Sequence, residues 1–172
     1  MGRRHLAFVV LGMLPLIAHA AAPSQAARQA DIPASCPVTI PATTGFVPPQ
    51  PYPAAAPFPR TGWIGTADLW TMVATDGRYH GLHVPTGYRQ KLFWWRAGYD
   101  GRLEPRPALA LTATHLDPPT PSLQVRDATN AFADDLGGWT MLVMPDLPDS
   151  GCWRLTGEYG GTSLSYVVWV DR

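Results

Sequence analysis

The stretch SGCWRLTGEYGGTSLSYVVWV, residues 150–170, decides the fold. Two apolar segments, CWRLTGEY at 152–159 and SLSYVVWV at 163–170, lie on either side of Gly160 and Gly161. A glycine pair between two segments of strand-forming residues is typical of a tight β-hairpin, because glycine adopts the positive φ angles that such a turn requires. The sequence therefore predicts that the chain ends in two long paired strands.

From Thr61 to this hairpin, the apolar runs are short and turn residues separate them. We find no run with helical periodicity, although residues 127–136 have room for one helical turn. Including the hairpin, the expected strands cover residues 69–74, 79–84, 90–97, 108–116, 122–127, 139–144, 152–159 and 163–170. Strands without intervening helices favour an antiparallel arrangement. The sequence predicts an all-β fold, an antiparallel immunoglobulin-like sandwich of about 7–8 strands, over residues 61–172.

The turn before the hairpin has the spacing of an immunoglobulin-type corner: Asp149, Gly151 and then an aromatic residue, Trp153. In such a corner the ring packs beneath the turn, and its polar atom bonds to nearby backbone. Trp153 takes the place usually held by tyrosine. Alternation along the strand places Trp153 inward and Cys152 outward. We therefore expect Cys152 to hold something that lies outside the sheet.

The first twenty residues have the pattern of a signal peptide. A basic head, MGRRH, precedes the apolar stretch LAFVVLGMLPLIA and the small-residue site AHA, which predicts cleavage after Ala20. The apolar stretch is too short to span a bilayer, and no later segment is long enough to do so. We expect a signal peptide at 1–20, an Ala/Pro-rich segment at 21–60, and a periplasmic or secreted product.

Export changes how the two cysteines, Cys36 and Cys152, are interpreted. In an oxidising compartment two cysteines usually pair, and this pair would close a loop of more than 100 residues. Two buried free thiols, or a zinc site completed by histidines, are the alternatives. If the disulfide forms, it anchors the proline-rich stretch at 47–60. That stretch is then either a semi-rigid spacer or a strap lying along the domain.

Adjacent aromatic residues raise the question of what covers the sheets. Trp94 and Trp95 point to opposite faces of a strand, and so do Val168 and Trp169. A sheet that is apolar on both faces needs a cover on each, and the proline-rich segment is the expected second cover. The alternative is an exposed platform for sugar rings or a partner protein. The candidate platform consists of Trp94, Trp95, Arg96, Arg89 and Trp169.

Residues for catalysis or metal binding do not converge in the sequence. His80 and His83 are three apart, which places them on opposite faces of a strand. Asp127, Asn130, Asp134 and Asp135 follow one another without EF-hand spacing, so calcium binding in that loop is the lesser alternative to a solvated loop. No serine elbow is present, and Cys152 has a simpler role in a disulfide. We expect no catalytic residue, metal or cofactor.

The pieces KLFWWRAGYDG, LTATHLD and SGCWRLTGEYGGTSLSYVVWV together resemble a group of uncharacterised exported bacterial proteins with immunoglobulin-like sandwiches. The resemblance covers roughly residues 61–170 and implies the fold and export, but no activity. Charge is low, with 13 basic and 13 acidic residues, which excludes a nucleic-acid binder. We expect a non-catalytic binding module of the cell envelope, with a glycan or an envelope protein as partner. An extracytoplasmic hydrolase using carboxylates and a purely structural envelope protein are the alternatives.

Overall fold

The glycine pair forms the predicted hairpin. In the computed structural model, which describes residues 32–171, β12 (Gly151–Tyr159) pairs antiparallel with β13 (Thr162–Val170). Tyr159 faces Thr162 across the turn, and Gly160 and Gly161 have φ angles of 57° and 83°. The predicted signal peptide lies outside the described residues.

The hairpin lies in the middle of a five-stranded sheet, here called the hairpin sheet. Its order is β3 (Arg78–Tyr79), β13, β12, β7 (Ala110–His115) and β8 (Leu123–Val125). All neighbours are antiparallel except β3, which runs parallel to β13. Leu109, Leu111 and Ala113, at alternate positions along the chain, are all buried.

A second five-stranded sheet, here called the tryptophan sheet, faces the first. Its order is β1 (Thr61–Gly65), β2 (Trp70–Ala74), β6 (Leu92–Trp95), β10 (Gly138–Val143) and β9 (Thr129–Ala133). Every pairing in it is antiparallel. The expectation for residues 127–136 was therefore incomplete, because β9 precedes the single 3-10 turn η1 (Asp134–Leu136).

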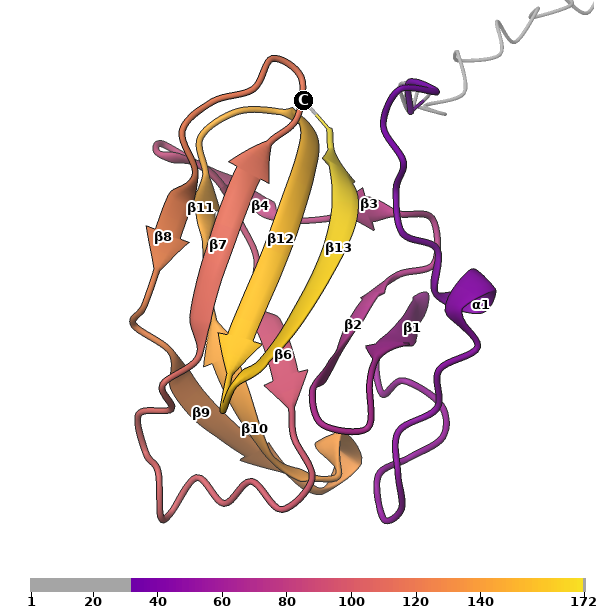
Figure 1. The fold of residues 1–172 in the computed structure, drawn as a ribbon, viewed down its shortest axis with the longest axis vertical. Coiled ribbons are helices and arrows are strands. Elements are labelled where there is room, and N and C mark those ends of the chain that lie inside the picture. The colour runs from indigo at the N-terminus through magenta and orange to yellow at the C-terminus, as the bar shows by residue number, and fades with distance from the viewer. Residues whose placement is uncertain (1–31, 172) are drawn as a thin grey trace, which may run out of the picture.

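The main core lies between these two sheets (Figure 1). Trp94 and Met141 enter it from the tryptophan sheet, and Trp153, Leu155 and Tyr166 enter it from the hairpin sheet. Gly157 leaves the space that Trp94 needs, because a Cβ there would lie 2.4 Å from the indole ring. Full burial of one large apolar side chain stabilises the fold by about 1.5–3 kcal/mol, so this interlayer core is the main source of stability. The expected all-β fold is confirmed.

A small third sheet lies beside these layers. Its order is β11 (Asp146–Leu147), β5 (Gly87–Arg89) and β4 (Leu82–Val84). The prediction of one strand over residues 79–84 was wrong, since β3 joins the hairpin sheet and β4 joins the small sheet. Gly81 lies at the break, and a Cβ at Gly81 would approach the ring of Tyr79 to 2.6 Å.

The N-terminal segment packs on the outside of both large sheets (Figure 1). The predicted disulfide between Cys36 and Cys152 is confirmed. Just after it, the Thr39 N–H donates to the Val167 carbonyl at 2.8 Å, and the Val167 N–H donates to the Thr39 hydroxyl at 3.0 Å. The short helix α1 (Pro41–Thr44) then leads the chain to the tryptophan sheet. The described part of the N-terminal segment, residues 32–60, therefore lies along the domain and is not a spacer. We call residues 32–60 the strap.

No helix in residues 32–171 has both the length and the apolar character needed to cross a membrane.

Candidate functional site

Two tryptophans of the candidate platform are buried, Trp94 in the core between the sheets and Trp95 beneath the strap. Trp94 and Trp95 are both 0% exposed. On the outer face, Trp95 packs edge-on against Trp63 at 4.8 Å, and its indole N–H donates to the Leu136 carbonyl at 3.0 Å. Tyr52 from the strap completes this cluster and donates to the Arg96 carbonyl at 3.1 Å. Neither Trp94 nor Trp95 therefore offers a ring to a ligand.

The other members of the candidate platform lie apart from one another. Trp169 is half-buried beside the disulfide, and its N–H donates to Asp171 at 3.0 Å. Arg96 lies over the ring of Tyr159, at the opposite end of the hairpin. Arg89 belongs to β5 in the small sheet. The structure does not bring these three side chains together on one surface.

The corner residues have the contacts expected from their spacing. The Trp153 indole N–H donates to the Asp149 carbonyl at 3.0 Å, and the ring is buried in the core. Gly151 has a φ of 125°, and a Cβ there would lie 2.5 Å from His115. His115 packs edge-on against Trp153 at 4.8 Å and occupies the space that a side chain at position 151 would need.

The two histidines and Asn130, which the sequence singled out as candidate ligands, have local partners. His80 Nε2 lies 3.1 Å from the Asp76 carboxylate, and His83 packs against Tyr88 at 5.2 Å. Asn130 donates to the carbonyls of Gly101 and Pro105. In residues 32–171, no three His, Cys, Asp or Glu side chains are grouped so that they could hold a metal ion.

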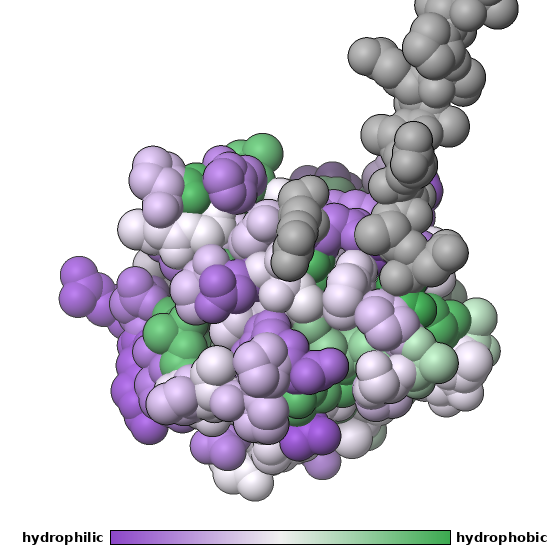
Figure 2. Space-filling model, turned by 90° about the horizontal axis from the view of Figure 1, so that it is seen from above, coloured by the Kyte–Doolittle hydropathy of each residue, from purple (hydrophilic) through white to green (hydrophobic). Residues whose placement is uncertain are grey.

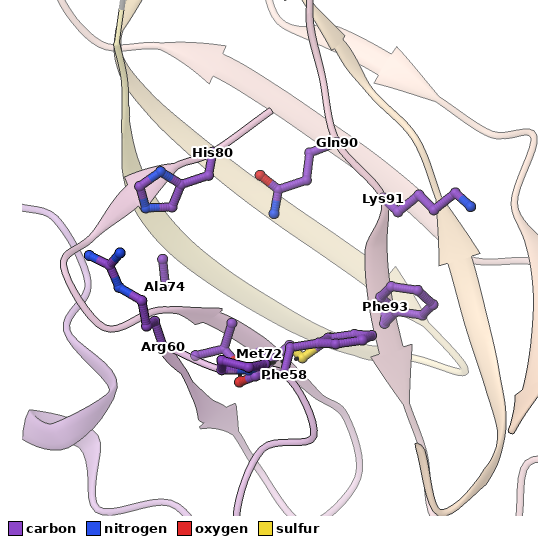
Figure 3. A pocket seen from close by; sticks show the side chains of 10 residues that line it. Phe58, Arg60, Met72, Ala74, His80, Gln90, Lys91 and Phe93 are labelled. Atoms are coloured by element: carbon purple, nitrogen blue, oxygen red, sulfur yellow. Dashed lines mark hydrogen bonds between the residues drawn. The ribbon is translucent and has the colours of Figure 1, made fainter. Parts of the chain in front are cut away.

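A cavity of about 360 Å³ opens where the strap joins the tryptophan sheet (Figure 3). Pairing between β2 and β6 stops at Thr71 and Trp94, and beyond that point the two strands line the cavity from different sides. Its lining consists of Phe58, Pro59, Arg60, Thr61, Met72, Ala74, His80, Gln90, Lys91 and Phe93. We call this cavity the seam pocket.

One wall of the seam pocket is a tight turn that holds Arg60. The Thr61 N–H and hydroxyl both donate to the Phe58 carbonyl, and the Thr75 N–H and hydroxyl both donate to the Arg60 carbonyl. Within residues 32–171, Arg60 is the only non-glycine residue with positive φ, at 62°. A side chain in this conformation costs about 1–3 kcal/mol, and such strain is concentrated at functional sites.

Polar groups occupy the upper part of the seam pocket. The Oε1 atom of Gln90 is buried and has no hydrogen-bond partner within the described residues, while the amide nitrogen points down toward Phe58 and Met72 (Figure 3). His80 lies on the same side as Arg60. Its partner Asp76 has a pKa below the usual value: burial raises that pKa, but hydrogen bonds from the Arg78 N–H and from His80 outweigh the burial. Lys91 extends away from the cavity in this view.

Aromatic and thioether side chains form the apolar floor of the seam pocket. The Phe58 and Phe93 rings are 5.5 Å apart, and Met72 lies beside Phe58 (Figure 3). The pocket therefore combines an apolar floor with three basic residues, and its lining includes no aspartate or glutamate. An apolar surface with a few polar groups beside it is the usual composition of a small-molecule site.

No sequence pattern predicts this pocket. Phe58 and Arg60 come from the strap, Met72 from β2 and Gln90 from the loop before β6, so no local motif contains them together. Other cavities, of about 300–410 Å³, are lined around Tyr79 and Asp171, around Glu158 and Gly161, and around Arg96 and Tyr159. On the face drawn in Figure 2, apolar areas alternate with hydrophilic residues.

Comparisons with known proteins give no guide to the ligand. No family model matches the chain, and neither a curated protein nor a solved structure matches it significantly.

Proposed function

We propose that this protein is an exported, non-catalytic binding module of the bacterial cell envelope, with an immunoglobulin-like sandwich as its scaffold and the seam pocket as its binding site. The observation that carries the proposal is that two energetically unfavourable features meet in one small cavity. These are the strained backbone of Arg60 and the unpartnered Oε1 atom of Gln90. Natural proteins keep such features where function requires them.

Export is supported by the basic and apolar N-terminus and by the disulfide, which forms and persists in oxidising compartments. The scaffold assignment is supported by the corner at Trp153 and by two sheets that share one core. The expected glycan or protein platform receives no support from Trp94 or Trp95, because both are buried. A cavity of about 360 Å³ suits a small molecule better.

A binding role is favoured over the hydrolase alternative. That alternative requires carboxylates that converge, and the seam pocket is lined by none. The hydroxyl of Thr61, which also lines the pocket, donates to the Phe58 carbonyl and not to a general base.

The proposal is tested by NMR of protein labelled at the methionine methyl groups. Met72 lines the pocket, whereas Met141 is fully buried between the sheets and serves as an internal control. We expect a low-molecular-mass extract of bacterial envelope to shift the Met72 methyl resonance and to leave Met141 unchanged.

The matched variant Ala74→Phe fills the cavity from one of its lining positions. It is expected to abolish the Met72 response while Met141 retains its native chemical shift. If no fraction of the extract shifts Met72 in the unmodified protein, the seam pocket is not a binding site and the proposal fails.

A further inference from the structure

We infer that the seam pocket binds a compact organic carboxylate: an anionic group held by Arg60 and by the Gln90 amide, joined to an apolar body of about one aromatic ring. This inference rests on the proposed function and specifies its ligand class. It is carried by the charge, geometry and size of the pocket.

The charge of the pocket selects an anion. Within residues 32–171, the Arg60 guanidinium has no carboxylate partner, and the pocket lining includes no acidic residue. Asp76, whose partner His80 lines the pocket, is hydrogen-bonded to His80 and to the Arg78 N–H. An exposed arginine is usually satisfied by water. Here, however, the strained Arg60 backbone is fixed by two hydrogen bonds from Thr75, so the fold holds the base of this exposed side chain at the wall of the pocket.

The available donors favour a carboxylate over other anions. In Figure 3 the Arg60 guanidinium lies at the left wall, on the His80 side, and the Gln90 amide lies above the middle of the cavity. The exposed Arg60 side chain therefore turns inward when both groups hold one carboxylate. A guanidinium is a planar fork that matches two carboxylate oxygens. Gln90 adds one further donor group, because its amide nitrogen points into the cavity (Figure 3). One fork and one amide suffice for a carboxylate. A phosphate carries more charge and more acceptor oxygens and would need further donors. Of the other two basic residues in the lining, His80 is paired with Asp76 and Lys91 extends away from the cavity (Figure 3).

The remainder of the pocket selects an apolar body. Phe58 and Phe93, 5.5 Å apart, form with Met72 a floor that lies below the polar groups (Figure 3). Phe58 is 37% exposed, so part of its ring remains available for a ligand to cover. A volume of about 360 Å³ lies at the small end of the range for ligand sites, which suits one ring and a short chain.

The test uses three defined probes: 3-phenylpropionate, its neutral amide and acetate. Titration is followed by the Met72 methyl resonance and by calorimetry. We expect 3-phenylpropionate to bind saturably. The amide lacks the negative charge and acetate lacks the aromatic ring, so each should bind at least about tenfold more weakly.

Variants distinguish a direct contact of Arg60 with the carboxylate from an effect of the protein's overall charge. Arg60→Gln is expected to weaken 3-phenylpropionate binding about tenfold, because it removes a charged donor. Arg106→Gln removes the same charge from an exposed position outside the pocket, and it should leave binding unchanged. Gln90→Leu should weaken binding while leaving the midpoint of thermal unfolding unchanged or higher, since it also removes the unpartnered Oε1 atom.

Equal binding of the acid and its amide, or equal losses in Arg60→Gln and Arg106→Gln, would overturn the carboxylate assignment. A Met72 shift with envelope extract but none with 3-phenylpropionate would also overturn it, and would leave the binding module intact. If neither the extract nor the probe shifts Met72, the proposed function fails together with the ligand class.

Discussion

At the scale of single residues, two buried tyrosines show how the same hydroxyl group has opposite effects. The Tyr166 hydroxyl is buried without a hydrogen-bond partner in the described part of the chain, whereas the Tyr79 hydroxyl donates to the Pro145 carbonyl at 3.4 Å. Burial, and then the proximity of Tyr79, raises the pKa of Tyr166 well above its usual value. Both hydroxyls therefore stay protonated. Only in Tyr79 does a hydrogen bond offset the free-energy cost of removing the hydroxyl from water.

We predict that Tyr166→Phe leaves the free energy of unfolding unchanged or raises it by about 1 kcal/mol, because it removes an unsatisfied buried group. The matched variant Tyr79→Phe should lower it by about 1 kcal/mol, because the Pro145 carbonyl loses its donor. Urea denaturation at neutral pH measures both. Equal destabilisation by the two substitutions would contradict this account of the core.

At the scale of elements, the small sheet is held by a charged pair between its strands. Arg89 on β5 donates through Nε and Nη2 to Asp146 on β11, and the Thr86 hydroxyl donates to the same carboxylate at 2.9 Å. The hydrogen bonds from Arg89 hold the pKa of Asp146 below its usual value. A carboxyl group with a lowered pKa in the folded state stabilises that state above its unfolded pKa, and this stabilisation is lost as the pH falls toward the lowered value.

Asp146→Asn should therefore lower the midpoint of thermal unfolding at neutral pH. The difference from the unmodified protein should shrink as the pH falls below about 4, where the carboxyl group of the unfolded chain becomes protonated. Thermal unfolding monitored by circular dichroism between neutral pH and pH of about 3 tests this. Asp127→Asn removes one negative charge from an exposed site and is the control. A difference independent of pH would assign the effect to packing instead.

At the scale of the whole molecule, the strap packs on the outer faces of both the hairpin sheet and the tryptophan sheet, and the disulfide anchors it. Cys36 and Cys152 are separated by 116 positions, so the crosslink constrains most of the described chain when it is unfolded. The strap that it anchors covers Val167 beside the disulfide and Trp95 further along. Loss of the disulfide should therefore affect the stability of the entire domain.

The double variant Cys36→Ala with Cys152→Ala should lower the free energy of unfolding by about 4–5 kcal/mol, as expected for closing a loop of this length. Urea denaturation measures the change, and unmodified protein kept in reductant should unfold at the same urea concentration as the variant. A loss of less than about 1 kcal/mol would mean that the strap packs equally well without its anchor.

The amino-acid sequence alone was sufficient wherever interactions are local. Alternation placed Trp153 inward and Cys152 outward, the glycine pair predicted the hairpin turn, and the two cysteines were expected to pair. The strand prediction was wrong at residues 79–84, because the chain breaks at Gly81 and the two halves of the run join different sheets. What covers Trp95, and where a cavity forms, depends on segments far apart in the chain. The seam pocket exists because β2 and β6 diverge and the strap turns at Arg60, and only long-range packing determines both.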